Sequence, residues 1–410
     1  DKRLTYSIHV ERAFNGLVEL GYLSITTEGF HDRKGRKDGT PTSRLTRYVS
    51  TDQLLSLFTD QELSVLPVIV PQYNDPELLK IRVKEVDATG VKRKRSITIS
   101  ETAETERMRS NLERINKALS RHWCDLEIQD DTLTDLQRRL AGDPAGERTI
   151  RMDQRSLYRV FNDPELQTGG RFYGGWWQNI PKEARKHLVV NGKKMVELDY
   201  SNQHPSILYA KEGIARPDDC YSDVINPYSL PKAVNRKQLR KAVKTAFNAM
   251  LNSQKPLKRP PKGLKLQPLG LTWAELSSAI ITFHEPIAHY FYTGLGLQLQ
   301  RLDSDIAEKV LLHFADKGIA ILPLHDSFIM HHGYRDWLEP VMHDAYLEVV
   351  GQSSQVDLKV WHDPVTTFDD SLGQPTNLSI VEILADQQGH ADRLDAFRTL
   401  QKGSRIRKAS

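Results

Sequence analysis

The sequence predicts an α+β protein in which short antiparallel strands carry two aspartates and a basic helix lies between them in the chain. Asp199 ends a short apolar run, and Asp326 sits at the tip of an apolar hairpin 127 positions later. From Lys232 to Lys265 the chain has eleven Lys or Arg residues and no Asp or Glu. Because neighbouring strands bring their ends together, we expect the two carboxylates to meet beside a concentrated positive charge.

The composition sets broad limits on the class of protein. A chain of 410 residues is expected to form roughly two to four domains, and 39% apolar with 27% charged residues suits a folded core. The formal charge is only +4, so any nucleic-acid surface must come from local clusters of cations.

The cysteines and the chain ends bear on location. Cys124 and Cys220 lie far apart in unrelated contexts, which argues against a disulfide framework or a zinc site and favours a reducing, cytoplasmic compartment. A bacterial or phage source is a separate expectation, which the cysteines do not test. No run of about eighteen apolar residues and no signal pattern is present, so we expect no membrane association. The first residue is Asp rather than Met, and we expect the natural protein to extend further N-terminally.

Residues 1–60 are predicted to form a winged-helix-like nucleic-acid-binding module. Apolar residues recur at helical spacing from Ser7 to Leu20, and Gly21 is a candidate C-cap. Alternating segments at 22–30 and 43–49 are expected as strands around a basic loop. The cations of this loop, which would contact phosphates as a wing, are Arg33, Lys34, Arg36 and Lys37. A solvated hairpin with ordinary surface charge is the alternative.

The following segments alternate between strand and helix patterns. Residues 61–150 are predicted to contain a β-hairpin and then a helical stretch from Glu101 to Leu140. A buried strand ends at Asp199, and the next helix has Pro205 in its first turn. The tail 376–410 is polar, helical in part and basic at its end, and no residue pattern in it indicates a catalytic or binding function.

The two aspartates have the chemistry of a metal site for phosphoryl chemistry. An isolated Asp at a strand end is more often an Asx-turn or a helix cap. Two of them in apolar settings, with a basic helix between, favour a pair of carboxylates that holds two hard cations about 3.5 to 4 Å apart. Such a pair activates an attacking hydroxyl and stabilises a leaving phosphate. The pattern therefore predicts nucleotidyl transfer.

The helix predicted at 236–252 has an apolar face and a cationic face. The apolar side chains are Leu239, Val243, Ala246, Phe247 and Met250. The polar side chains recur every four residues and are Arg236, Arg240, Lys244, Asn248 and Asn252. Like charges four residues apart cost about 0.2 to 0.5 kcal/mol each in an isolated helix, and no acid relieves them here. A bound triphosphate or nucleic-acid backbone would offset the repulsion between these cations.

These residues resemble the right-hand polymerases, both the A-family DNA polymerases and the single-subunit phage-type RNA polymerases. Asp199-Tyr-Ser is similar to motif A, Arg240-x-x-x-Lys244 to motif B of the fingers helix, and His325-Asp326-Ser-Phe to motif C. The segment 168–181 resembles the one that precedes motif A, and 300–306 resembles the helix that monitors the primer–template. The five matches follow the family's order over residues 168–330.

The resemblance implies an architecture for the rest of the chain. A palm with an antiparallel sheet would consist of residues 151–230 and 300–375. Small helical fingers would occupy 231–299, and a thumb-like region would lie within 61–150. The winged-helix-like domain would precede them.

The resemblance also implies roles for single residues. Asp199 and Asp326, assisted by the carbonyl of Tyr200, would bind two Mg²⁺ ions, with Mn²⁺ as an alternative. Lys244 and Arg240 would hold the triphosphate of the incoming nucleoside triphosphate. The remaining nucleotide contacts would be Arg236, Asn248, Asn252 and His204. The contacts to template and primer would be Arg171, Gln178, Asn179, Gln300 and His325. Trp176 and Trp177 would either stack on a template base or belong to the core.

The sugar specificity is where the chain departs from the DNA polymerases. Those enzymes exclude ribonucleotides with an acid in motif A near an aromatic residue in motif B, and they place Glu after the second aspartate. Here the four positions after Tyr200, which end at His204, hold no carboxylate, the motif B position is Asn252, and Ser327 follows the second aspartate. Asn and His can hydrogen-bond a hydroxyl, so ribonucleotides are expected to be accepted.

Three functions are compatible with these patterns. The first is a template-dependent nucleic-acid polymerase with an A-family-like palm. The second is an RNA polymerase or primase of single-subunit type. The third is a DNA-binding replication initiator or regulator that keeps a non-catalytic polymerase-like fold. Intact Asp199, Lys244 and Asp326 favour the enzymes.

Overall fold

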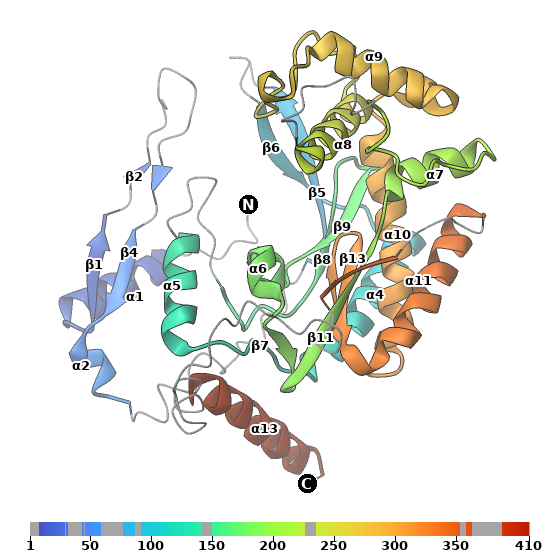
Figure 1. Cartoon of the computed structure of the whole chain (residues 1–410). Helices are drawn as coiled ribbons and strands as arrows, with labels where there is room; N and C mark the ends of the chain where they lie inside the picture. The colour runs from blue at the N-terminus through green and yellow to red at the C-terminus, as the bar shows by residue number, and fades with distance from the viewer. Residues whose placement is uncertain are drawn as a thin grey trace, which may run out of the picture. The chain divides into compact units, whose positions relative to one another are not determined.

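The computed structural model describes residues 8–28, 30–31, 43–44, 46–58, 77–86, 92–141, 150–225, 235–352, 358–362 and 388–409 (Figure 1). Its helices and several sheets make it an α+β protein, as the sequence predicts. The chain divides into two compact units. The first comprises residues 1–71, 86–93 and 391–410, and the second comprises 72–85 and 94–390.

The first unit begins with a helix that is followed by short antiparallel strands. Its elements are α1 (Ile8–Glu19), β1 (Leu23–Thr27), β2 (Phe30–His31), β3 (Ser43–Arg44), β4 (Arg47–Ser50) and α2 (Asp52–Leu55). Strand β1 pairs with β4, and β2 pairs with β3. Phe14 packs on Tyr48 with ring centroids 5.0 Å apart, which fixes α1 on the β1–β4 pair. The order helix, strand, strand is the predicted one, and the winged-helix assignment stays a prediction. The basic loop with Arg33, Lys34, Arg36 and Lys37 lies outside the described residues.

A six-stranded antiparallel sheet forms the centre of the second unit. Its strands are β7 (Cys124–Leu126), β10 (Leu188–Val190), β11 (Lys193–Tyr200), β12 (Ile321–Leu324), β13 (Ser327–His331) and β14 (Leu358–His362). They follow the order β12-β13-β11-β10-β7, and β14 also pairs with β11. Strand β11 is therefore internal, and the strand that ends near Asp199 is bordered by partners on both edges.

A second sheet and long helices pack around this centre. The second sheet has the order β6-β5-β8-β9 and consists of β5 (Leu79–Val86), β6 (Lys92–Ile97), β8 (Tyr158–Phe161) and β9 (Gly169–Tyr173). Helix α10 (Gly296–Ala315) contacts β9, α4 (Ala103–Ser120) and α11 (Arg335–Val350), as seen beside the sheet in Figure 1. The guanidinium of Arg159, fully buried, donates to the carbonyl of Gly170 and to Ser304 Oγ, and so joins β8 and β9 to α10.

Helix α8 (Arg236–Asn252) matches its predicted bounds. All five residues of its predicted apolar face are buried. The other helical elements of the described second unit are α5 (Asp130–Ala141), η1 (Trp176–Asn179), α6 (Lys182–Arg185), α7 (Gln203–Lys211), η3 (Gln267–Leu269), α9 (Trp273–Phe283), η4 (Glu285–Tyr290) and η5 (His332–Tyr334). Helix α13 (Gln388–Ala409) closes the chain, in the tail predicted to be partly helical. Among the described helices, none combines the length and apolar character that crossing a bilayer requires.

One element expectation is wrong. The stretch from Glu101 to Leu140 is not continuously helical, because α4 ends at Ser120 and strand β7 intervenes before α5. The three residues of β7 are buried and pair with β10, 62 or more positions later in the chain. This pairing outweighs the local helical pattern, which cannot report a partner so far away in sequence.

Candidate functional site

The strand register places Asp199 and Asp326 beside each other. Asp199 lies opposite Ser327, the first residue of β13, and the amide of Tyr200 donates to the carbonyl of Asp326 with N···O 3.2 Å. Residues that face each other across antiparallel strands lie about 4.5 to 5.5 Å apart at Cα. The two aspartates therefore occupy one end of the sheet, on neighbouring strands, and both are half-buried.

A tight turn with an uncommon backbone conformation holds Asp326. Leu324 pairs with Ser327, which leaves His325 and Asp326 as the two central residues between β12 and β13. His325 has φ of 64°, in the left-handed region that residues other than glycine seldom adopt. Such a conformation costs free energy and is often found at functional sites.

Glu197 is a third carboxylate at this end of the sheet, and the sequence analysis missed it. Alternate side chains of a strand share a face, so Glu197 lies on the same face of β11 as Asp199. It is 5% exposed, accepts a hydrogen bond from Ser327 Oγ (3.0 Å) and pairs with Arg185 (3.2 Å). Ser327, the residue after Asp326, therefore contacts a carboxylate of the neighbouring strand.

Asp303 of α10 is a second carboxylate that the sequence analysis missed. Its Oδ2 accepts hydrogen bonds from Arg171 of β9 (2.6 Å) and from His204 Nε2 of α7 (2.8 Å). It is 2% exposed, and burial raises its pKa, but the charges and hydrogen bonds of His204 and Arg171 outweigh burial and lower the pKa of Asp303. Asp303 therefore joins three segments as an ionised acceptor.

The Asp303 cluster lies within electrostatic reach of the turn that carries Asp326. Burial lowers the pKa of His325 and Arg171 lowers it further, while Asp326 and Asp303 act in the opposite direction. The two clusters are thus parts of one polar site. The neutral form of His325 is the favoured one there.

The cations of helix α8 have the predicted spacing, but an acidic side chain pairs with one of them and offsets its repulsion with the others. Arg240 Nε donates to Asp219 Oδ2 at 2.8 Å, so the expectation of an unrelieved cationic face is wrong at this position. Burial opposes the effect, but hydrogen bonds from Arg240 and Ser222 lower the pKa of Asp219 to about 2. Asp219 precedes the acid-free stretch, which is why the local pattern missed it. Lys244 is exposed and has no acidic partner among the described residues.

Tyr221 connects α8 to the aspartates. Arg240 lies 5.3 Å and Lys244 5.9 Å from the centroid of its ring. The pKa of Tyr221 is raised, chiefly by burial and also by the charge of Asp326. The tyrosine is therefore within electrostatic reach of both the cations of α8 and the carboxylate of Asp326.

The remaining nucleotide-contact predictions are placed as follows. Arg236 is exposed at the first position of α8. The side chain of Asn252 donates to the carbonyl of Asn248 (2.7 Å) and lies against Gly296, where an added Cβ would clash with its Oδ1. Asn252 thus lies at the first turn of α10, whereas His204 contacts Asp303 seven residues later, roughly 10 Å along the helix. The structure does not bring these two sugar-contact candidates together.

A cleft of about 460 Å³ opens beside His325. It is lined on one side by tyrosines whose rings follow one another toward the turn: the Tyr158 and Tyr173 centroids are 6.3 Å apart, and Tyr173 meets the edge of His325 at 5.6 Å. Lys80 Nζ lies 3.9 Å from the centroid of Tyr158. Gln178 and Asn179, two predicted nucleic-acid contacts, line the same cleft.

Of the two alternatives for the tryptophans, the structure supports the core, because Trp176 and Trp177 are fully buried. Trp177 Nε1 donates to the carbonyl of Pro323, which anchors η1 on strand β12. Tyr200 is also buried and donates its hydroxyl to the carbonyl of Met342, so only its main chain faces the aspartates. Gln300, half-buried, lies one turn before Asp303 on α10.

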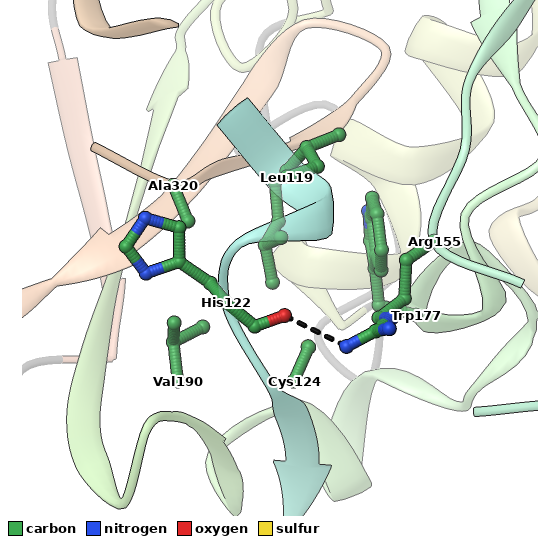
Figure 2. Close-up of a pocket in the computed structure, with 8 residues that line it drawn as sticks. Leu119, His122, Cys124, Arg155, Trp177, Val190 and Ala320 are labelled. Carbon is green, nitrogen blue, oxygen red and sulfur yellow. Dashed lines mark hydrogen bonds between the residues drawn. The ribbon is translucent and has the colours of Figure 1, made fainter. Parts of the chain in front are cut away.

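A small cavity of about 10 Å³ elsewhere in the second unit is structural. Figure 2 shows it between the end of α4 and the sheet, lined by Leu119, His122, Cys124, Arg155, Trp177, Val190 and Ala320. The carbonyl of His122 accepts a hydrogen bond from Arg155 (2.8 Å), the dashed line in Figure 2. Burial raises the pKa of Cys124, which makes its thiol unreactive.

The donor set at the sheet end fits hard divalent cations. Within the described residues, no group of three or more His, Cys, Asp or Glu side chains forms a closed metal cage. Mg²⁺ does not need one, since it keeps several waters and binds through one or two carboxylates together with substrate phosphates. Asp199 and Asp326 supply two half-buried carboxylates at one end of the sheet, and carboxylates are the donors through which this ion binds.

The comparisons with known proteins add little to this geometry. No protein-family model matches the chain, and no curated protein is significantly similar to it. Among solved structures it is similar to the POL domain of Pol1 from M. smegmatis in complex with DNA primer-template and dNTP, with 16% identity and a TM-score of 0.36. The likeness covers 56% of this chain and 49% of that chain, so this chain spans about half of that chain's length. A likeness at this level assigns no function, and the function is therefore derived from the site itself.

Proposed function

We propose that this chain is a template-dependent nucleotidyltransferase, a nucleic-acid polymerase that adds nucleoside triphosphates to a primer end. The observation that carries the proposal is the register of β11 and β13, which sets Asp199 opposite Ser327 and next to Asp326. An aromatic cleft opens beside the turn that carries Asp326, and Tyr221 lies within electrostatic reach of both Asp326 and the cations of α8. A cleft and a cationic helix together suit a nucleic acid and a triphosphate. The polymerase resemblance of the motifs supports the same reading.

Asp199 and Asp326 are the residues that would hold two Mg²⁺ ions, or Mn²⁺ in their place. When bound, such ions activate the attacking hydroxyl and stabilise the leaving phosphate. The ion pair between Glu197 and Arg185 balances one negative charge beside the aspartates, so the site does not add a third uncompensated carboxylate.

Lys244 is the cation that we assign to the triphosphate. Arg240 is already paired with Asp219, whereas Lys244 is exposed one helical turn further along α8. A fixed ammonium group near the β- and γ-phosphates stabilises the charge that develops on the leaving pyrophosphate. Asp219 in turn holds Arg240 in place beside it.

The cleft beside His325 is assigned to the nucleic acid. Tyrosine rings stack on bases without regard to sequence, and each stacked base contributes about 1 to 3 kcal/mol. Lys80 adds a positive charge at Tyr158, at one end of the row of rings, and His325 lies at the other, next to Asp326. The row thus leads from a cation to the proposed reaction centre.

The test is extension of labelled primers on DNA and RNA templates, with ribonucleotides or deoxynucleotides, in Mg²⁺. Asp199→Asn and Asp326→Asn should each abolish incorporation and keep the thermal stability and nucleic-acid affinity of the wild type. Asp336→Asn, on the exposed face of α11, makes the same chemical change away from the site and should retain activity. Synthesis by either active-site variant, or none by the wild type, would refute the proposal.

A second candidate function, RNA synthesis by a polymerase or primase of single-subunit type, is favoured by one observation. His204 stands five residues after Asp199, at the level where the DNA polymerases place an excluding acid. Its ring is held by Asp303 and remains partly exposed. An imidazole there can pair with a ribose hydroxyl, and a site built to pair a hydroxyl penalises the analogue that lacks it.

A further inference from the structure

Asp303 and His204 form a pair that the motifs do not account for. Helix α10 has apolar residues at 299, 306 and 310 on its buried face, and Asp303 occupies the position between them. A carboxylate in such a place costs several kcal/mol unless it is paired. His204 and Arg171, from two other segments, supply the partners.

The pair fixes which nitrogen of the imidazole carries hydrogen. An ionised carboxylate only accepts hydrogen bonds, so the contact of 2.8 Å to Asp303 Oδ2 places a hydrogen on Nε2 of His204. In the neutral ring Nδ1 is then the acceptor, since the partner of one ring nitrogen decides the state of the other. Among the described residues Nδ1 has no partner, and the His204 side chain is 18% exposed.

The position of His204 points to the bound nucleotide. Helix α7 begins four residues after Asp199, and His204 is its second residue. Asp303 and Arg171 act electrostatically on His325, the neighbour of Asp326. His204 therefore follows Asp199 closely in the chain, and its partner Asp303 is within electrostatic reach of the turn that carries Asp326, the other proposed metal ligand.

We propose that Asp303 is a positioning residue that orients His204 so that Nδ1 accepts a hydrogen bond from a hydroxyl of the nucleotide sugar. This inference rests on the proposed nucleotidyl transfer at Asp199 and Asp326. The hydroxyl is the 2′ or the 3′ group, and both present the same chemistry to an imidazole acceptor. Arg171 donates to the same oxygen, Oδ2, so two donors from different segments hold the carboxylate in this orientation.

The experiment measures binding of ATP, 2′-deoxy-ATP and 3′-deoxy-ATP to the full chain by calorimetry in Mg²⁺, and single-nucleotide incorporation of the same three. Wild type should prefer ATP over the analogue that lacks the contacted hydroxyl by about tenfold, the size of one hydrogen bond. His204→Ala should remove this preference. Asp303→Asn should reduce it by about fivefold, because the amide can donate to the ring and no longer fixes Nε2–H.

Asp305→Asn is the matched control. It makes the same change two residues later on α10, where Asp305 pairs with Arg159 and Arg301 and does not meet His204. It should lower thermal stability and keep the sugar preference of the wild type. The inference is overturned if Asp303→Asn lowers stability but keeps the preference, or if both variants change it equally. Absence of nucleotide binding by the wild type would overturn the proposed function as well, whereas binding with no preference between the three nucleotides would overturn this inference alone.

Discussion

Tyr173 meets His325 edge to face, next to the turn that holds Asp326, and no other described aromatic pair adjoins that turn so directly. If bases stack in the cleft, Tyr173→Ala should weaken binding of a labelled single-stranded oligonucleotide by about 1 to 3 kcal/mol, or roughly 5- to 150-fold in Kd. Fluorescence anisotropy at fixed salt measures this. Tyr334→Ala is the control, because Tyr334 also packs on a histidine, His331, but lies outside the cleft. Equal affinities of the two variants would contradict the assignment of the cleft.

Single residues show what the sequence could and could not indicate. The pairing of Asp199 and Asp326 follows from their places at a strand end and a hairpin tip. The sequence did contain a signal for Asp303, which is an acid among apolar residues at helical spacing. It also contained one for Glu197, which is an acid between apolar residues of a buried strand. The partner of Arg240 carried none, since Asp219 reaches it only through tertiary structure.

At the scale of elements, α8 is the part whose function is most directly tested. A cation that meets the triphosphate in the transition state should affect turnover more than template affinity. Lys244→Ala should therefore lower kcat by about 10- to 100-fold and change template Kd less than threefold, in the range of one electrostatic contact. Lys241→Ala removes an equal charge from the same helix, outside the row of residues four apart, and should change kcat little. Weaker template binding with unchanged kcat in Lys244→Ala would make α8 a backbone-binding surface.

Whether an element could be predicted from the sequence depended on how close in the chain the residues that determine it lie. Helix α8 and the β12–β13 hairpin were predicted because apolar spacing and a short turn are local properties. Strand β7 was missed because its three residues are too few for a period and its partner β10 is distant in the chain. In the central sheet β7 lies next to β10, where a helical continuation of α4 was expected.

For the molecule as a whole, the sequence predicts the fold class and the order of elements better than the pairing of strands. The α+β class and the buried strand before Asp199 agree with the structure. Strand β14 also pairs with β11. This pairing joins residues more than 150 positions apart, and no local sequence pattern indicates it. The palm and fingers assignments rest on motif resemblance and the winged-helix assignment on the order of elements, and all three stay predictions.

The stability of the second unit should depend on pH through a buried histidine. His284 is fully buried between three segments: Tyr209 donates to its Nδ1 (3.1 Å), and its Nε2 donates to the carbonyl of Cys220 (2.9 Å). Burial lowers the pKa of His284 to about 4, against the effect of the hydrogen bond to Cys220. In the unfolded chain the value is about 6.5. The unfolded state therefore binds the proton first as pH falls.

The sign of the effect follows from these two values. The contribution of His284 to the free energy of unfolding is complete above about pH 6.5, decreases as pH falls, and is lost near pH 4. Between pH 7 and pH 5 the wild type should lose about 2 kcal/mol that His284→Gln does not lose, since the amide keeps a donor and an acceptor without titrating. Urea unfolding of both proteins across this range measures the difference. His289→Gln, a change at an exposed histidine five residues later, should keep the wild-type slope. If the free energy of unfolding changed with pH in the same way in wild type and His284→Gln, the imidazole would have the same pKa in the folded and unfolded chain. The assignment of a neutral, hydrogen-bonded His284 in the core would then be wrong.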